Sequence, residues 1–158
     1  MFIKLTVTIL LLVTCSEYPG RKAPPVAEVE DQVFQLVNEF RRSKGLSSLR
    51  QVAAVRKEAQ RHSQNMARGI VPLSHLGFSE RIKRIREATG VKGRSGENVA
   101  EGYKTALEAV NAWKKSPGHR KHMLGAFDLT GVGVVRARNG KLYFTQIFIA
   151  SRNTRAAP

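Results

Sequence analysis

The apolar residues of this chain recur at two different spacings, and the change comes after Gly125. Before that glycine, a spacing of three to four residues predicts helices, listed here by residue number: 28–44, 51–68, 79–89, 105–115 and 116–124. Beyond it, β-branched and aromatic residues dominate, and Asn139-Gly140 between two such runs predicts two antiparallel strands joined by a type I′ hairpin. Helices followed by strands favour an α+β fold in which helices cover a small antiparallel sheet.

The chain has the length of one domain and a large excess of basic residues. Its 158 residues include 27 Lys and Arg against 12 Asp and Glu, a formal net charge of +15. Such a charge predicts attraction to anionic lipid, envelope polymer or nucleic acid. The basic residues are scattered, however, and show neither an aromatic RNA-binding motif nor zinc-finger spacing. We therefore expect an anionic lipid or polymer as partner and no dedicated nucleic-acid binding.

The N-terminus predicts export. Residues 1–14 place one lysine before the apolar run 5–13, which is shorter than the ~20 residues of a membrane span and is typical of a signal peptide. Cys15, the single cysteine, ends a Leu-Val-Thr-Cys sequence that resembles the bacterial lipoprotein cleavage box, in which the cysteine is lipidated. Thr14 departs from the small residue usual before that cysteine. Lipidation of Cys15, which would give a membrane anchor, and simple secretion therefore both stay open.

The remainder of the chain divides into a tether, a domain and a tail. Residues 16–27 contain three prolines and no apolar period, which is typical of a linker. The domain is expected over residues 28–152 and a short tail over residues 153–158. The protein is thus expected outside the cytoplasm, either secreted or lipid-anchored at a cell envelope.

Residues 95–124 concentrate polar side chains that are costly to bury. Glu97 lies in a Gly-Glu-Asn sequence that is expected to form a turn. The apolar helix that follows ends at Trp113, which is expected to be a core residue. Ser116-Pro117 is a strong helix start and places His119 near the beginning of the next helix. Glu97 and His119 are therefore expected to face one cleft.

Four other side chains have predicted positions. His62 is expected to be a hydrogen-bonded core histidine, and Ser79 to cap the third helix. Arg81 is expected to point into solvent with the other basic residues of that helix. His122, one turn after His119, is expected to point away from the cleft. The positive end of the helix dipole is expected to disfavour protonation of His119.

Five blocks of sequence follow one another within residues 33–150. They are Ala59 to Met66-Ala67, His75, Gly96-Glu97-Asn98-Val99-Ala100, Trp113-x-x-Ser116-Pro117-Gly118-His119-Arg120 and Gly131-Val132-Gly133-Val134. In this order and spacing the chain resembles the bacterial branch of the CAP superfamily, also called the SCP-like domain (cysteine-rich secretory protein, antigen 5, pathogenesis-related 1). The disulfides of animal and plant members are absent, as in other bacterial members.

The resemblance implies an α-β-α sandwich whose cleft holds two histidines and one or two acidic residues. The matching positions are His75, Glu97 and His119, and Asn98 is expected to line the same binding cleft. The second glutamate of many eukaryotic members, three residues after the tryptophan, is replaced here by Ser116. Because family members are associated with zinc and with sterol and fatty-acid binding, the resemblance implies these as ligands.

The predicted cleft allows more than one chemistry. Two neutral imidazoles, His75 and His119, form a partial site for zinc or another divalent metal, with Glu97 as third ligand, orienting group or general base. The alternative is a hydrogen-bonded polar cluster that fixes loops to the sheet beside a binding cleft. No serine elbow or phosphate-binding loop competes. If the protein is an enzyme, its candidate catalytic residues are therefore Glu97, His75 and His119.

These patterns favour an exported CAP-domain protein that binds a ligand, rather than an enzyme. The cleft residues His75, Glu97, Asn98 and His119 and the basic surface are expected to supply the binding site. A metal-assisted hydrolase acting on peptide or cell-wall bonds at the same cleft is the first alternative. A protein of adhesion or host interaction is the second.

Overall fold

The computed structural model describes residues 24–151. The predicted signal peptide, Cys15, most of the predicted tether and the predicted tail lie outside these residues. Five helices and four strands are formed within residues 24–151: α1 Val26–Arg42, β1 Arg50–Gln51, α2 Ala53–Ala67, α3 Phe78–Thr89, β2 Ser95–Glu101, α4 Ala106–Lys115, α5 Pro117–Met123, β3 Leu129–Arg136 and β4 Leu142–Ile149. Among the helices of this part of the chain, none is long and apolar enough to cross a bilayer.

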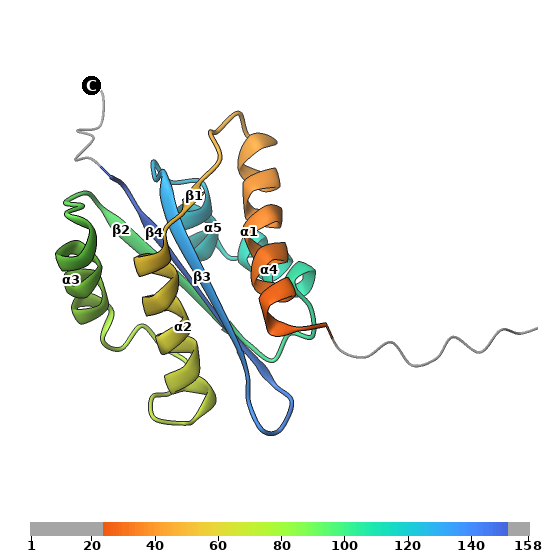
Figure 1. The fold of residues 1–158 in the computed structure, drawn as a ribbon. Helices are drawn as coiled ribbons and strands as arrows, with labels where there is room; N and C mark the ends of the chain where they lie inside the picture. Colours follow the sequence, from red (N-terminus) through yellow and green to blue (C-terminus); the bar gives the residue numbers. More distant parts are fainter. Residues whose placement is uncertain (1–23, 152–158) are drawn as a thin grey trace, which may run out of the picture.

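The strands form one sheet in the order β1-β3-β4-β2. β4 pairs antiparallel with both β3 and β2, and the two-residue β1 pairs parallel with β3. α2 and α3 lie on one side of this sheet, and α1, α4 and α5 lie on the other (Figure 1). The predicted α+β fold and its α-β-α layers are therefore confirmed.

Alternate residues of the central strands supply two hydrophobic cores, one on each side of the sheet. Val132 and Val134 of β3, with Phe144 and Phe148 of β4, pack in the core that contains α1, α4 and α5. Leu129 of β3 and Ile147 and Ile149 of β4 pack in the core that contains α2 and α3. Because both faces are covered, the central strands are apolar on both sides rather than on alternate residues.

Two glycines let α2 pack directly on β3. A Cβ atom added to Gly131 would lie 2.2 Å from the backbone nitrogen of Arg56, and one added to Gly133 would lie 2.2 Å from the backbone nitrogen of Gln60. Real Cβ atoms do not approach backbone so closely, since interiors are close-packed. The Gly-Val-Gly block therefore serves the packing of helix on strand.

Two local predictions about the strands were wrong. The Gly-Glu-Asn sequence is not a turn but part of β2, which pairs with β4 from Ser95 opposite Ile149 to Glu101 opposite Tyr143. The hairpin between β3 and β4 exists, but it is not type I′. That turn needs positive φ at both central residues, and within residues 24–151 only glycines have positive φ, among them Gly140 at 83°.

The ends of the helices agree with prediction only in part. Thr105 precedes α4, and its side chain accepts a hydrogen bond of 3.2 Å from the backbone N–H of Glu108. Pro117 is the first residue of α5, as predicted. Ser79 does not cap α3, because the helix begins one residue earlier, at Phe78, after a left-handed Gly77.

Candidate functional site

The buried carboxylate of Glu97 on β2 is the centre of a polar cluster. The Glu97 side chain is 2% exposed. Its Oε1 accepts hydrogen bonds from Nδ1 of His75 at 2.9 Å and from Nη2 of Arg81 at 2.7 Å, and its Oε2 accepts one from Nε of Arg81 at 3.0 Å. Both carboxylate oxygens are therefore engaged by cationic or polar donors of the protein.

Arg81 was expected to point into solvent, and that prediction was wrong. Its side chain is 5% exposed, and its Nη1 donates to the carbonyl oxygen of Leu76 at 2.8 Å. A buried guanidinium requires a carboxylate and further acceptors to offset its desolvation, and Glu97 and Leu76 supply them. Arg81 thus ties α3 and the preceding loop to β2.

His75 is the solvent-facing member of the cluster. It lies in the loop between α2 and α3, and its side chain is 52% exposed. Because a carboxylate only accepts hydrogen bonds, Nδ1 of His75 carries the proton in its bond to Glu97. Nε2 has no hydrogen-bond partner among the described residues. The carboxylate thus orients an imidazole whose second nitrogen is free for a ligand.

Asn98, the next residue of β2, holds α5 through two hydrogen bonds. It is fully buried; its Nδ2 donates to the carbonyl oxygen of His119 at 3.1 Å, and its Oδ1 lies 2.9 Å from Nδ1 of His122. A Cβ atom on Gly96 would lie 2.7 Å from the His122 ring. His122, predicted to point away, therefore packs against β2 beside Glu97.

The histidines influence one another's pKa. Burial lowers the pKa of His119, and charge on His75 and His122 lowers it further. The predicted direction is thus correct, although burial rather than the helix dipole is the main cause. Burial also lowers the pKa of His62 and of His122, with His75 contributing in both cases. All three other histidines are thus within electrostatic reach of His75.

His62 belongs to the support of the cluster rather than to its surface. It is 2% exposed, and its Nε2 donates to the carbonyl oxygen of Ser74 at 2.8 Å. The prediction of a hydrogen-bonded core histidine is confirmed. Trp113 is likewise buried, with Nε1 donating to the carbonyl oxygen of Val99 at 3.2 Å. Its ring centre lies 6.4 Å from that of His119.

The sequence contains signals for the true positions of Arg81 and His122, both of which were predicted wrongly. Phe78, Arg81, Ile82 and Ile85 follow the i, i+3, i+4, i+7 spacing of one helix face, and the last three are buried. His119 and His122 are three residues apart, so they share a face of α5. Helical spacing therefore places Arg81 inward and His122 beside His119.

Comparison with known families shows to which family this chain belongs. The profile of the cysteine-rich secretory protein family, CAP, matches residues 34–148. The chain belongs to the CAP family. The match includes all of the residues in the polar cluster and the glycines of β3.

Relatives of this CAP chain include two proteins of Bacillus subtilis (strain 168). Uncharacterized protein YkwD is 31% identical over 125 residues, which are 78% of this chain and 48% of the relative. Uncharacterized membrane protein YlbC is 32% identical over 123 residues, which are 76% of this chain and 34% of the relative. The chain thus spans about half or less of the curated relatives that it matches.

Solved structures share the fold of this CAP chain. An outer surface protein of Borrelia burgdorferi superposes with a TM-score of 0.71 at 18% identity, covering 82% of this chain and 97% of that protein. An extracellular protein of Bacillus anthracis with an SCP domain superposes with a TM-score of 0.66 at 29% identity, covering 78% of this chain and 41% of that protein.

The donor groups of this CAP site do not form a complete set of metal ligands among the described residues. Within residues 24–151, no group of three or more His, Cys, Asp and Glu side chains is placed to hold a metal ion. The engaged oxygens of Glu97 fit the role of orienting group for His75 better than the role of third ligand. Zinc binding by His75 and His119 stays a prediction.

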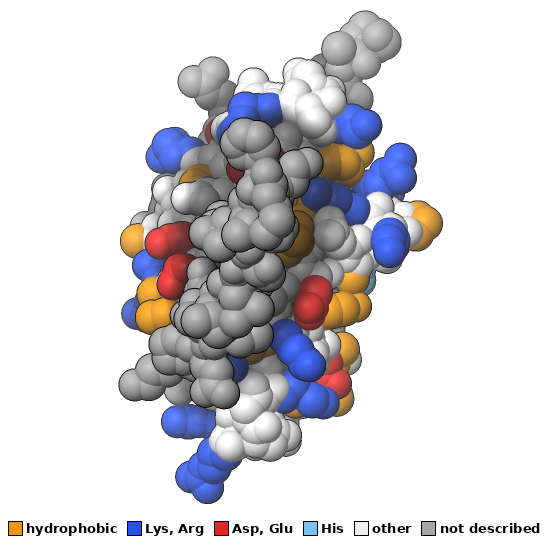
Figure 2. Space-filling view, turned by 90° about the vertical axis from the view of Figure 1, so that its right-hand side faces the viewer, with side chains coloured by type: hydrophobic (Ala, Val, Ile, Leu, Met, Phe, Trp, Pro, Cys, Tyr) orange, Lys and Arg blue, Asp and Glu red, His pale blue; other side chains and the backbone are white. Residues whose placement is uncertain are grey.

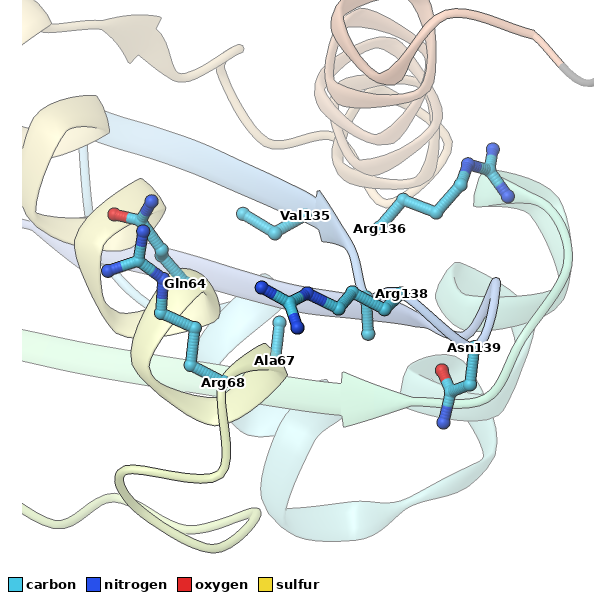
Figure 3. Close-up of a pocket in the computed structure, with 8 residues that line it drawn as sticks. Gln64, Ala67, Arg68, Val135, Arg136, Arg138 and Asn139 are labelled. Carbon is cyan, nitrogen blue, oxygen red and sulfur yellow. The ribbon is translucent and has the colours of Figure 1, made fainter.

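A cavity of about 700 Å³ lies away from the histidines. It is lined by residues at the end of α2 and around the β3–β4 hairpin, including Arg68, Arg136 and Arg138 (Figure 3). On the side of the molecule where α1 and α4 lie, Lys and Arg side chains are spread among Asp and Glu (Figure 2). The arginines of the cavity are thus a local grouping within a generally basic chain.

Proposed function

We propose that this CAP protein acts outside the cytoplasm by binding a ligand at the cluster of His75, Glu97, Asn98 and His119. The predicted signal peptide supports the location, and the Bacillus anthracis relative is described as extracellular. Lipidation of Cys15 or simple secretion would both deliver the domain there. The formal net charge of +15 favours an anionic partner, such as a fatty acid, an anionic lipid or an envelope polymer.

The engagement of Glu97 is the observation that carries this proposal. Its two oxygens accept three hydrogen bonds from His75 and Arg81, so a general base or metal ligand at this position would first have to give up a buried ion pair. The same bonds leave His75 exposed and oriented. A group that presents one fixed imidazole, backed by further histidines, is suited to recognising a ligand without transforming it.

Binding of a long-chain fatty acid, measured before and after replacement of the exposed residue His75, tests the proposal. Oleate is the probe, because its carboxylate can accept a hydrogen bond from Nε2 of His75 when the ring is protonated, and its chain supplies apolar contact. We expect His75→Ala to weaken oleate binding at least about tenfold, the loss of one charge-assisted hydrogen bond. Ser79→Ala is the control, since Ser79 is exposed at the start of neighbouring α3. Equal affinity in both variants, measured by calorimetry, would remove the cluster as the binding site.

A metal-assisted hydrolase is the competing function. The hydrogen bond that His75 donates to Glu97 holds the His75 ring in one orientation, as a general base needs. Cleavage of cell-wall fragments and peptides, with and without added zinc, separates the two functions. Zinc-dependent cleavage that His75→Ala abolishes would support the hydrolase. Oleate binding without cleavage would support the binding protein. Adhesion remains the second alternative.

A further inference from the structure

The loop between α2 and α3 exposes large apolar side chains. Ile70 is 63% exposed, Leu73 is 45% exposed and Leu76 is 62% exposed. In the rest of residues 24–151, Leu107 on α4 is the remaining large apolar side chain of comparable exposure. Exposed apolar side chains that occur singly need no explanation, whereas a group of them marks a surface that binds a partner or a membrane.

The cavity of about 700 Å³ adjoins this loop. Arg68 follows α2 and precedes Ile70 by two residues. Arg136, at the end of β3, and Arg138, in the hairpin, also line the cavity. None of the eight residues that line it is acidic. Figure 3 shows the side chain of Arg138 extending toward Gln64 and Arg68, whereas Arg136 turns away. Guanidinium groups placed in this way suit phosphate oxygens, which they bind through a planar fork of donors.

The start of the α2–α3 loop, the basic cavity and the start of the domain lie at one end of the molecule, and the rest of the loop runs from there along the side of the molecule to α3. In Figure 1, the α2–α3 loop leaves α2 at the same end as the β3–β4 hairpin and then runs up to α3. Nη2 of Arg136 lies 3.5 Å from the carbonyl oxygen of Pro24, so the domain also begins there. A lipid anchor on Cys15 would hold this end within about 30 Å of a bilayer, given the reach of about 3.5 Å per extended residue.

We propose that this end of the molecule docks on a bilayer that contains anionic phospholipid. Ile70, Leu73 and Leu76 enter the boundary between head groups and acyl chains, while Arg68 and Arg138 bind head-group phosphates. Interfacial binding depends on this combination, because apolar burial and attraction to anionic lipid add together. A polyanionic polymer would engage the arginines but not the apolar side chains. A second copy of the same chain would bring like charges together.

This inference rests on the proposed function, because it names a lipid surface as the anionic partner and as the source from which a lipid would reach His75. His75 lies in the same loop as Leu73 and Leu76. Docking would therefore hold the segment that carries His75 on the side of the domain that adjoins the bilayer contact. The two proposals nevertheless depend on different side chains, so they can fail separately.

Vesicle flotation of the full chain tests the docking end. Vesicles of phosphatidylcholine alone are compared with vesicles that also contain phosphatidylglycerol. Arg68→Gln/Arg138→Gln removes two cavity arginines, and Arg42→Gln/Arg50→Gln removes two exposed arginines where α1 ends and β1 begins, at the opposite end of the sheet. The N-terminal apolar run is common to every variant, so differences between variants report the docking end.

We expect the cavity variant to lose about 30-fold in partition to phosphatidylglycerol vesicles, from about 1 kcal/mol for each basic residue near an anionic surface. The control pair is expected to lose much less. Leu73→Ser/Leu76→Ser is expected to lose at least about tenfold on both kinds of vesicle, because apolar burial does not depend on lipid charge. Leu107→Ser is its matched control. All of these positions are exposed, and unchanged thermal unfolding confirms that the variants are folded.

Two results would overturn the docking proposal. One is equal loss from the cavity pair and the control pair, which would leave only a diffuse charge effect. The other is unchanged vesicle binding by Leu73→Ser/Leu76→Ser, together with loss of polyphosphate binding by the cavity variant, which would identify an anionic polymer as the partner. Either result would overturn docking alone if oleate binding is kept in the docking variants and lost in His75→Ala. The proposed function would then still stand.

Discussion

The polar cluster on β2 and the glycine contact on β3 are built from equally short blocks of sequence, but they work in opposite ways. Gly131 and Gly133 bring no side chain, and their value is the space that lets the backbone of α2 approach β3. Glu97 and Asn98 bring buried polar side chains, each of which needs partners from other segments. One block removes atoms from an interface, and the other adds hydrogen bonds across it.

The difference shows which parts of the family resemblance concern function. The glycine block determines how closely a helix packs on a strand, and nothing about it depends on a ligand. The polar block also holds structure together, because Glu97 anchors α3 and Asn98 anchors α5. His75, exposed at the edge of that block, presents a ring nitrogen that is free for a ligand. Functional tests therefore belong at His75, and stability tests at its buried neighbours.

Replacement of Glu97 by Gln is expected to have the largest effect on stability. Gln is nearly the same size but leaves the buried guanidinium of Arg81 without its carboxylate, and breaking a buried ion pair in this way costs about 3–5 kcal/mol. Urea unfolding followed by circular dichroism measures the free energy of unfolding. His75→Ala removes one exposed donor to the same carboxylate and is expected to cost less than about 1 kcal/mol. Equal, small losses in both variants would contradict the structural role of Glu97.

Gly133→Ala tests the other region. The added Cβ would lie 2.2 Å from the backbone nitrogen of Gln60, so α2 must move away from β3, at a cost of about 3 kcal/mol. Gly118→Ala is the matched control, because a Cβ on Gly118 in α5 meets nothing within 4 Å. There the same change is expected to stabilise by about 0.5–1 kcal/mol, through helix propensity. A stable Gly133→Ala variant would show that the helix does not depend on this contact.

The fold could largely be predicted, because repeated apolar spacing reflects which face of each element is buried. The helix predicted over residues 28–44 is observed as Val26–Arg42, and the two last strands are where the pattern indicated. β2 was missed because Gly96, Glu97 and Asn98 have low strand propensity. They are extended because every one of them pairs with β4, and pairing with a distant segment leaves no local signal.

The sequence could name candidate residues for the site but not their contacts. His75, Glu97, Asn98 and His119 were identified from motifs that resemble a family, and the structure brings Glu97 to His75 and Asn98 to His119. Arg81 was assigned to solvent because its neighbours on α3 are basic. A charged residue on the apolar face of a helix is buried only when it has a partner. The partner of Arg81 is Glu97 of β2, which comes from a different part of the sequence.

Asn98→Ala is expected to have an intermediate effect. It removes the bonds to His119 and His122 and leaves a partly buried carbonyl and a partly buried ring nitrogen without the partner that Asn98 supplies, a loss of about 2 kcal/mol in the free energy of unfolding. Asn111→Ala, at an exposed position of α4, is the control and is expected to change stability by less than about 0.5 kcal/mol. If both variants unfold at the same urea concentration, α5 is held by its apolar contacts alone.

Acidification should produce the smallest and most gradual loss of stability. Burial lowers the pKa of His62, His119 and His122 in the folded protein, so the unfolded chain takes up protons at a higher pH than the folded chain. The free energy of unfolding is therefore highest above the ordinary histidine pKa of about 6.5 and falls as the pH decreases toward the lowered values. Urea midpoints between about pH 7 and about pH 5 measure this slope.

His122→Gln removes one of the partly buried titrating rings and should make the pH slope shallower. Gln offers an amide donor for the oxygen of Asn98, so the contact across β2 and α5 can be kept while the proton-binding group is lost. Asn111→Ala leaves every histidine in place and should retain the full slope. The pH dependence therefore distinguishes the glycine contact on β3 from the polar cluster on β2. Gly133→Ala lowers the free energy of unfolding at every pH, whereas the histidines of the cluster lower it only on acidification. A slope unchanged in His122→Gln would mean that this ring binds its proton equally well in the folded and the unfolded chain.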